Sequence, residues 1–240
     1  MTLEYYNNFY KDLAEIDAKD NNPYKIKDFS DNFKTKTKIL DIGCGFGSVS
    51  GDLVKSNHIV HGIEINTDAI NECEKKGIVI VSNDLNSMEK IEEKYDCILL
   101  LDILEHIMEP LDLIEKSSKL LSPNGQIIVS VPLYFDIFDR LKILFTGDVI
   151  SIDNLSYGKE LYKRFRSYNY DHIRFFRPKD IIEMGEIHNL SISQLTYNPG
   201  GYFGNNKFLR FLSRLVSNKY SAKLFPNLLA HSMIFSWQKK

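Results

Sequence analysis

Cysteine is scarce in this chain, and long apolar runs are absent. The three cysteines, Cys44, Cys73 and Cys97, are scattered and odd in number, without a CxxC pair or a histidine cluster. The sequence therefore predicts neither a disulfide framework nor a metal site, and we expect a protein of the reducing cytosol. No window holds 18 consecutive apolar residues, and the N-terminus is polar where a signal peptide needs an apolar run. A membrane-spanning helix and a secretion signal are not expected.

Acidic residues are missing from the C-terminal part of the chain. The last one is Glu186, and the 54 residues that follow carry seven Lys and Arg. That tail has a charge of +7 and the preceding residues −9, within a net charge of −2. Such a split indicates an anionic partner or a membrane surface for the basic part. With 240 residues, 43% of them hydrophobic, residues 1–240 are expected to form a single domain.

Strand and helix patterns alternate along the first half of the chain. Apolar, β-branched runs predict strands at Lys38–Ile42, His58–Ile65, Ile78–Ser82, Tyr95–Leu101 and Gln126–Val131. Helices are predicted between them at Gly47–Ser56, from Asn66 or Thr67 to Lys76, and at Pro110–Leu121, with an SPNG turn before the fifth strand. This alternation is typical of a doubly wound α/β fold, a parallel sheet with helices on both faces.

The second half of the chain does not continue this alternation of strands and helices. Residues 132–177 are long, aromatic and basic, and we interpret them as a lid over the substrate. Pro178 begins a further helix, and two strands are predicted at Leu190–Tyr197 and His231–Gln238. Between those strands, residues 202–227 form a helical insertion.

Three glycines alternate directly after the first strand, in the string LDIGCGFG. Gly43, Gly45 and Gly47 have no Cβ, so the chain can turn with positive φ and present bare N–H groups at a helix N-terminus. A nucleotide-like cofactor is the natural ligand of such a loop.

Acidic residues stand at the ends of the first four strands: Asp41, Glu64, Asp84 and Asp102. Glu64 follows Asp41 by 23 residues, close to the interval of an acid that binds ribose hydroxyls. Asp84 suits an exocyclic amine, with Leu85 packing on the ring. Taken singly, Glu64 could be a solvated strand end and Asp84 an Asx-turn residue, but their order and spacing together indicate a cofactor site.

Several strings resemble the successive motifs of class I S-adenosylmethionine-dependent methyltransferases, over about Thr37–Val131. They are LDIGCGFG, HGIEIN, ND, YDCILLLDILEHIMEP and LLSPNGQIIVSVP. DILEH and HIRFFRPKDI are similar to the branch that contains the ubiquinone and menaquinone biosynthesis methyltransferases. The resemblance implies a Rossmann-like sheet of seven strands in the order 3-2-1-4-5-7-6, with the last strand antiparallel. It also implies S-adenosylmethionine as the cofactor.

The same resemblance assigns parts of the cofactor to residues. The glycine loop and Asp41 would contact the methionine moiety, and Glu64 the ribose hydroxyls. Asp84 and Leu85 would hold the adenine, and Leu101 and Asp102 would lie beside the sulfonium. The complete expected set is Asp41, Gly43, Cys44, Gly45, Gly47, Glu64, Ile65, Asp84, Leu85, Leu101 and Asp102.

Two other functions remain open from the sequence. A nicotinamide-dependent oxidoreductase shares the glycine loop, but its fingerprint is GxGxxG, whereas Ser48 follows Gly47 here. Asp41 would repel a pyrophosphate and suits the ammonium of a methionine moiety. A non-catalytic protein that keeps the fold is the second alternative, against which the intact loop, Asp41 and Glu64 argue.

The acceptor is less well defined than the donor. For a hydroxyl acceptor, His106 and His172 are candidate general bases, although each could merely order its own turn. Tyr168, Tyr170 and Arg174 are candidate substrate-binding residues, because arginine binds anions and tyrosine offers flat apolar walls. A solvated loop with its aromatics in the core is the alternative for this segment. A nucleic-acid partner is not expected.

Residues 206–217 read as a basic amphipathic helix. One face carries Phe208, Phe211, Leu212, Leu215 and Val216, and the others Lys207, Arg210 and Arg214. Such a helix either lies on an anionic membrane or packs on the edge of the sheet. We therefore expect a cytoplasmic methyltransferase, in peripheral contact with the inner face of the membrane. Its acceptor is expected to be small or lipid-linked, with methylation at oxygen rather than carbon or nitrogen.

Overall fold

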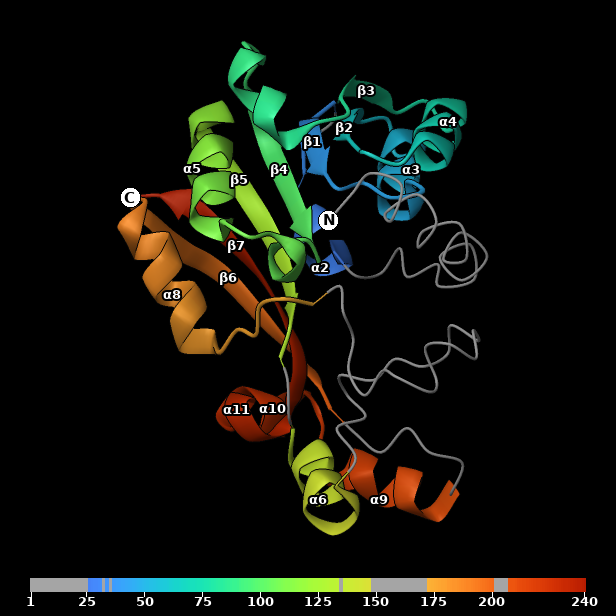
Figure 1. Ribbon diagram of the computed structural model, residues 1–240, viewed down its shortest axis with the longest axis vertical. Helices are drawn as coiled ribbons and strands as arrows, with labels where there is room; N and C mark the ends of the chain where they lie inside the picture. Colours follow the sequence, from blue (N-terminus) through green and yellow to red (C-terminus); the bar gives the residue numbers. More distant parts are fainter. Residues whose placement is uncertain (1–25, 32, 35, 134–135, 148–171, 201–206) are drawn as a thin grey trace.

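A seven-stranded sheet forms the centre of the protein (Figure 1). The computed structural model describes residues 26–31, 33–34, 36–133, 136–147, 172–200 and 207–240. The strands are β1 (Lys38–Ile42), β2 (Ile59–Ile63), β3 (Val79–Ser82), β4 (Tyr95–Leu101), β5 (Leu121–Pro132), β6 (Leu190–Pro199) and β7 (Ala230–Lys239). Their order is β3-β2-β1-β4-β5-β7-β6, and β7 runs opposite to the other six strands. The expected fold class and strand order are confirmed.

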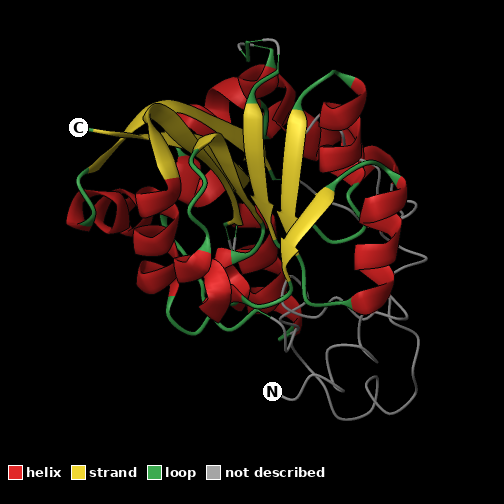
Figure 2. Cartoon of the chain, turned by 90° about the horizontal axis from the view of Figure 1, so that it is seen from above, coloured by secondary structure: helices red, strands yellow, loops and turns green. Residues whose placement is uncertain are grey.

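Helices cover both faces of this sheet (Figure 2). The longer ones that alternate with the strands are α3 (Ser48–Lys55), α4 (Thr67–Lys75), α5 (Pro110–Leu120) and α8 (Pro178–Ile187). Shorter elements are α2 (Lys27–Ser30) and the 3₁₀ turns η2 (Leu85–Lys90) and η3 (Leu104–His106). Four helices follow β5 and β6: α6 (Ile137–Thr146), α9 (Lys207–Val216), α10 (Lys219–Leu224) and α11 (Pro226–Leu229). Among the described helices, none is long and apolar enough to cross a bilayer.

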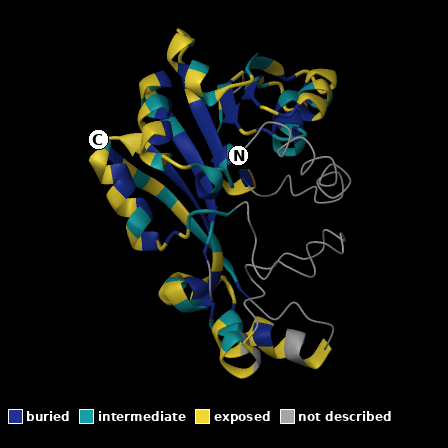
Figure 3. Cartoon of the chain, in the orientation of Figure 1, coloured by how far each residue is buried: buried dark blue, intermediate teal, exposed yellow. Residues whose placement is uncertain are grey.

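The strands divide their side chains between two hydrophobic clusters. Ile98 and Leu100 of β4 pack on the side of α5 and α8, whereas Leu99 packs on the side of α2, α3 and α4. Successive side chains of a strand point to opposite faces, so a strand covered on both faces must be apolar throughout. This explains why the central strands are the most buried part of the chain (Figure 3).

Two elements differ from the sequence-based expectation. β5 starts at Leu121 rather than Gln126, because the SPNG string lies inside the strand instead of forming a turn before it. The register with β4 shifts there, from Tyr95↔Leu121 to Cys97↔Gln126, so the extra residues bulge out of the ladder. Gly125 permits this bulge, since a Cβ at this position would lie 2.9 Å from the Tyr95 carbonyl oxygen.

The second difference is helix α6, within the segment that the sequence predicts only as a lid. Asp136 caps it by accepting hydrogen bonds from the N–H groups of Phe138 and Asp139, at 2.8 and 3.1 Å. Gly147 ends it in the left-handed conformation, with φ 72°. An aspartate cap at the start of a helix and a left-handed glycine at its end are both common signals.

A tight contact between α8 and β7 offers a test of the packing. A Cβ on Gly185 would lie 2.5 Å from Nε1 of Trp237, which is completely buried. We expect Gly185→Ala to lower the free energy of unfolding by about 1–3 kcal/mol, because overpacking outweighs the better helix propensity of alanine. Urea unfolding measures this. Glu186→Ala, an exposed change on the same helix, is the control and should stay within about 0.5 kcal/mol of the wild type; equal stability of both variants would contradict the packing.

Candidate functional site

The glycine loop lies at the carboxyl end of β1 in a conformation that requires glycine. Gly43, Gly45 and Gly47 have φ values of 74°, 53° and 66°. A Cβ on Gly43 would lie 2.7 Å from Cδ1 of Ile103, and one on Gly47 would lie 2.6 Å from Cδ1 of Ile78. Backbone angle and available space therefore both exclude a side chain, and the loop presents bare backbone.

Glu64 anchors this loop to the end of β2. One carboxylate oxygen accepts a hydrogen bond from the Gly45 N–H, and the other accepts from the N–H groups of Ile65 and Asn66, all at 2.8 Å. Hydrogen bonds to an ionised group are stronger than neutral ones, so this contact holds two adjacent turns together. Sequence reasoning expected Glu64 only as a ligand, because no local pattern reveals a bond to a residue 19 positions away.

Asp41 is almost completely buried beneath the loop, at 3% exposure. Ser50, in the first turn of α3, donates a hydrogen bond to its Oδ2 at 2.5 Å. Burial raises the pKa of Asp41 to about 6, the nearby charge of Glu64 adds to the rise, and the Ser50 hydrogen bond opposes it. Ser50 was not predicted, although its place one turn into the helix after the loop is a usable signal.

Cys44 and Ile65 flank these acids. The Sγ atoms of Cys44 and Cys73 lie 3.6 Å apart below the loop, and the Cys73 thiol also donates to the Gly45 carbonyl at 3.2 Å. The contact with Cys73, followed by burial, raises the pKa of the Cys44 thiol. The Ile65 side chain is 42% exposed at the rim. Cys44 thus supports the loop from below, whereas Ile65 offers an apolar surface beside it.

Asp84 caps the 3₁₀ turn η2. Its Oδ1 accepts hydrogen bonds from the backbone N–H and the side-chain amide of Asn86, at 2.9 and 3.0 Å. The Asx-turn alternative for Asp84 therefore has support, and this turn fixes the direction of the carboxylate. Leu85 follows and packs partly against the core.

Asp102 follows Leu101 at the end of β4 with a φ of 51°, in the left-handed region that side chains avoid. Ser130 of β5 holds it there on two sides: the Ser130 carbonyl accepts from the Asp102 N–H at 2.9 Å, and the Ser130 hydroxyl donates to Oδ1 of Asp102. Strain of this kind persists where neighbours fix the residue, and it concentrates at functional sites.

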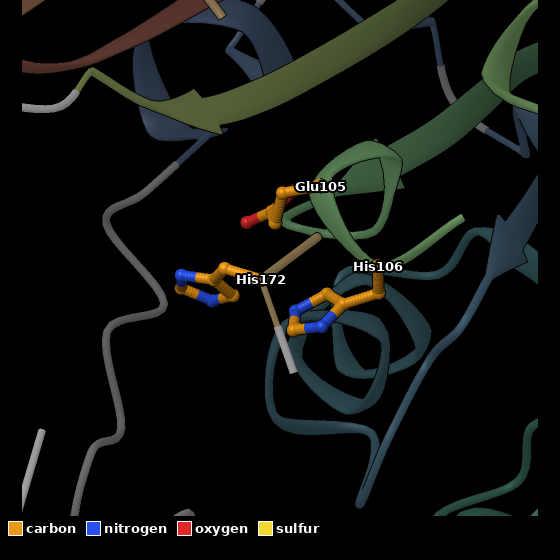
Figure 4. A group of neighbouring side chains, drawn as sticks. All are labelled: Glu105, His106 and His172. Atoms are coloured by element: carbon orange, nitrogen blue, oxygen red, sulfur yellow. The ribbon is translucent and has the colours of Figure 1, made fainter. Parts of the chain in front are cut away.

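The two candidate histidines lie side by side (Figure 4). His106 is the last residue of η3, and His172 precedes α8; their ring centroids are 4.7 Å apart with the planes at 67°. Glu105, 1% exposed, lies next to them. The structure therefore joins two residues that the sequence predicted independently.

The guanidinium of Arg174, which is predicted to bind substrate, donates a hydrogen bond to the Met108 carbonyl in the turn after η3. Tyr168 and Tyr170 lie outside the described residues. Most of the predicted lid and the start of the predicted insertion lie outside them too.

The predicted donor-site residues belong to the carboxyl edge of β1–β4. Asp41 and Glu64 at this edge are acidic, which would disfavour a pyrophosphate. Fold and site together define a Rossmann-like protein with an acidic, glycine-rich edge at the carboxyl ends of its parallel strands.

Comparison with known proteins narrows this class. The family model described as "Methyltransferase domain" matches residues 17–195. The chain belongs to this methyltransferase family, as the motifs predicted.

Among curated proteins, the chain is 28% identical over 211 residues to the ubiquinone biosynthesis O-methyltransferase of Coxiella burnetii, covering 84% of this chain and 82% of that protein. It is 29% identical over 180 residues to the protein of the same name from Colwellia psychrerythraea, covering 71% and 68%.

Solved structures share the fold. A SAM-dependent methyltransferase from Archaeoglobus fulgidus superposes with a TM-score of 0.61 at 16% identity, covering 98% of this chain and all of that one. Magnesium protoporphyrin IX methyltransferase from Synechocystis, with bound SAH, gives 0.58 at 17% identity, covering 98% and 88%. The solved structures confirm the fold, and the family model confirms the expected methyltransferase class, while the acceptor is not defined.

The raised pKa of Asp41 predicts a specific pH dependence of stability. Between about pH 4 and pH 6 the native state holds a proton that the unfolded chain has already lost, so Asp41 makes stability fall as pH rises through this window. Asp41→Asn cannot ionise. The free energy of unfolding of Asp41→Asn, relative to that of the wild type, should therefore rise by up to about 3 kcal/mol from pH 4 to pH 7. Urea unfolding at several pH values measures this difference. A difference that does not change with pH would contradict this assignment. Ser50→Ala should shift the midpoint of the wild-type change to higher pH.

Proposed function

We propose that this protein transfers a methyl group from S-adenosylmethionine to an oxygen atom of a small or lipid-linked acceptor. The observation that carries the proposal is the bare glycine loop between two acidic side chains, in a chain that belongs to a methyltransferase family. The names of the Coxiella and Colwellia relatives support oxygen as the target.

The residues present fit this donor. Asp41 and the loop backbone would bind the methionine moiety, and Glu64 the ribose hydroxyls. Asp84 and Leu85 would bind the adenine, with Leu101 and Asp102 beside the sulfonium. When bound, the cofactor supplies an activated methyl group, so the protein has to align the acceptor with it and exclude water.

Two alternatives predict different ligands. A nicotinamide-dependent oxidoreductase would bind NAD(H) and not S-adenosylhomocysteine in calorimetric titration, and this result would overturn the proposal. A non-catalytic relative would bind S-adenosylhomocysteine without turning over any acceptor. The presence of Asp41, all three glycines of the loop and Glu64 argues against a decayed site.

The ribose assignment predicts the effect of Glu64→Ala. Because the carboxylate carries three backbone hydrogen bonds as well as the proposed ribose contact, we expect S-adenosylhomocysteine to bind on the order of 100-fold more weakly, about 2–3 kcal/mol. Isothermal titration measures it. Glu64→Gln, which keeps one acceptor oxygen, should lose less, and Glu74→Ala on the exposed side of α4 should bind like wild type. Wild-type affinity in Glu64→Ala would refute the assignment.

We also propose that the protein docks on an anionic lipid bilayer through an apolar end formed by α6, α9, α10 and α11 (Figure 1). These helices are tied together: Arg140 of α6 donates to the Asn227 carbonyl at 2.7 Å, and Ser217 donates to the Leu229 carbonyl at 2.8 Å. The large apolar side chains exposed on the apolar end are Leu141, Leu144, Phe145, Phe208, Phe211, Leu212, Leu215, Val216, Tyr220, Leu224 and Phe225.

A helix that packs on the edge of the sheet buries its apolar face, whereas α9 exposes its apolar face to solvent. Ser213 of α9 and Ser217, which directly follows α9, are buried at 2% and 4% exposure, whereas Phe208 and Leu215 are 66% and 60% exposed. Exposed apolar area of this extent marks a binding surface. Lys207, Arg214, Lys219 and Lys223 are exposed on the same helices, in a tail without acidic residues, which favours anionic lipid as the partner.

Vesicle flotation tests this docking. Wild-type protein should float with vesicles that contain an anionic lipid and much less with purely zwitterionic ones. Phe211→Ser with Leu215→Ser should weaken the association by about tenfold or more, because two side chains no longer enter the apolar layer. Ile187→Ser, an equally exposed change on α8, is the control. Failure of the wild type to float, or unchanged flotation of the double variant, contradicts the proposal. If the wild type is a dimer and the double variant is a monomer, the surface binds a second copy of the chain instead.

A further inference from the structure

Two carbonyl groups of the glycine loop are bound by side chains at the end of α4. The Cys73 thiol donates a hydrogen bond to the Gly45 carbonyl at 3.2 Å, and the Lys76 ammonium donates one to the Phe46 carbonyl at 2.6 Å. Cys73 lies in the last turn of α4, and Lys76 directly follows that helix. Donors three positions apart lie on the same side of a helix, so α4 contacts two consecutive peptide units of the loop.

Glycines at the start of α3 make this close approach of α4 possible. A Cβ on Gly47 would lie 3.0 Å from Sγ of Cys73, and one on Gly51 would lie 3.1 Å from Cδ of Lys76. Glycine inside a helix is unfavourable relative to alanine, so Gly51 calls for a packing reason. The stem of Lys76 supplies that reason, because it lies over Gly51 while its ammonium reaches the loop.

Binding a loop carbonyl also fixes the direction of the next N–H group. A planar trans peptide points its C=O and the following N–H in opposite directions, and no peptide bond in the described residues is cis. Because α4 binds the Gly45 carbonyl, the Phe46 N–H must point away from α4. Glu64 restrains the preceding peptide unit, since it accepts a hydrogen bond from the Gly45 N–H. The directions of these N–H groups therefore depend on α4 and Glu64 together.

A loop rich in glycine needs such restraints more than other loops do. Gly45 and Gly47 have no Cβ, so the free chain reaches many backbone angles besides those found here. Fixing these angles when a ligand arrives would cost conformational entropy, whereas a loop that is already held avoids this cost. The contacts from α4 are therefore expected to raise the affinity for a ligand that binds the loop.

We propose that Cys73 and Lys76 are positioning residues for the methyl donor: they hold the glycine loop in the conformation that binds the methionine part of S-adenosylmethionine. This inference deepens the proposed function and rests on it, since that function assigns the methionine moiety to the loop. Neither side chain has to touch the cofactor. The adenosine part is assigned to Glu64, Asp84 and Leu85, so its binding should depend much less on the two residues.

Two ligands separate positioning of the loop from a general loss of structure. S-adenosylhomocysteine contains the amino-acid part, and methylthioadenosine lacks it. In calorimetric titration of the full-length protein, Lys76→Met should bind S-adenosylhomocysteine about three- to tenfold more weakly, because it keeps the apolar stem and loses one hydrogen bond. Its affinity for methylthioadenosine should stay within about twofold of that of the wild type. Lys76→Arg keeps a charged donor and should restore most of the affinity for S-adenosylhomocysteine.

The neighbouring residues provide matched controls. Lys75 is the adjacent lysine, but its ammonium pairs with Glu72 at 2.6 Å. Lys75→Met therefore loses the same charge and should bind both ligands as the wild type does. Cys73 gives an independent comparison: Cys73→Ala removes the donor to the loop and should weaken binding of S-adenosylhomocysteine, whereas Cys73→Ser keeps a hydroxyl donor and should weaken it less.

The outcomes separate this inference from the proposed function. If Lys76→Met binds S-adenosylhomocysteine as tightly as the wild type, or loses affinity for both ligands equally, the positioning role is overturned while the proposed function stands. The same selective loss in Lys75→Met would assign the effect to charge rather than to contact with the loop, and would also overturn it. A wild-type protein that does not bind S-adenosylhomocysteine at all overturns the proposed function, and this inference with it.

Discussion

Parallel strands can be joined only by crossovers, and this constraint brings every carboxyl end of β1–β4 to one edge of the sheet. Asp41, Glu64, Asp84 and Asp102 follow four different strands, yet each stands at that edge. The glycine loop and η3 begin there as well. The site is therefore a consequence of topology: residues spread over more than 60 positions meet because their strands point the same way.

The edge is held in shape by a few charged contacts. Glu64 fixes the loop through Gly45, and Ser130 fixes Asp102 in a left-handed conformation. Unfavourable backbone angles and buried carboxylates are both costly, and the surrounding hydrophobic clusters and hydrogen bonds offset them. Burial is the main reason why the pKa of Asp41 is raised, and the nearby charge of Glu64 adds a smaller repulsion.

Prediction from the sequence succeeded where local signals and periodicity suffice. β4 is found within its predicted bounds, Asn66 caps α4, and Pro110 and Pro178 begin their helices. It missed features that depend on contacts between strands. The bulge in β5 follows from its pairing with β4, and the partnership of Asp102 with Ser130 joins residues 28 positions apart. Helix α6 was missed for a different reason. Local signals, Asp136 and Gly147, mark its two ends, but the aromatic composition of the segment led to the prediction of a lid. The cluster of Glu105, His106 and His172 could not be predicted, because only the fold brings His172 to η3.

Topology also relates the donor site to the apolar end. β6 runs antiparallel to β7, and β7 runs antiparallel to β5, so β6 points in the same direction as β5. Helix α6 follows the carboxyl end of β5 and α9 that of β6, which puts both helices at the edge where β1–β4 also end (Figure 1). A bilayer bound to the apolar end would therefore lie on the site's side of the sheet rather than behind it. A lipid-linked acceptor could then keep its chain in the bilayer while its hydroxyl reaches the cluster after β4. Contact with the bilayer would also explain why the apolar face of α9 points outward.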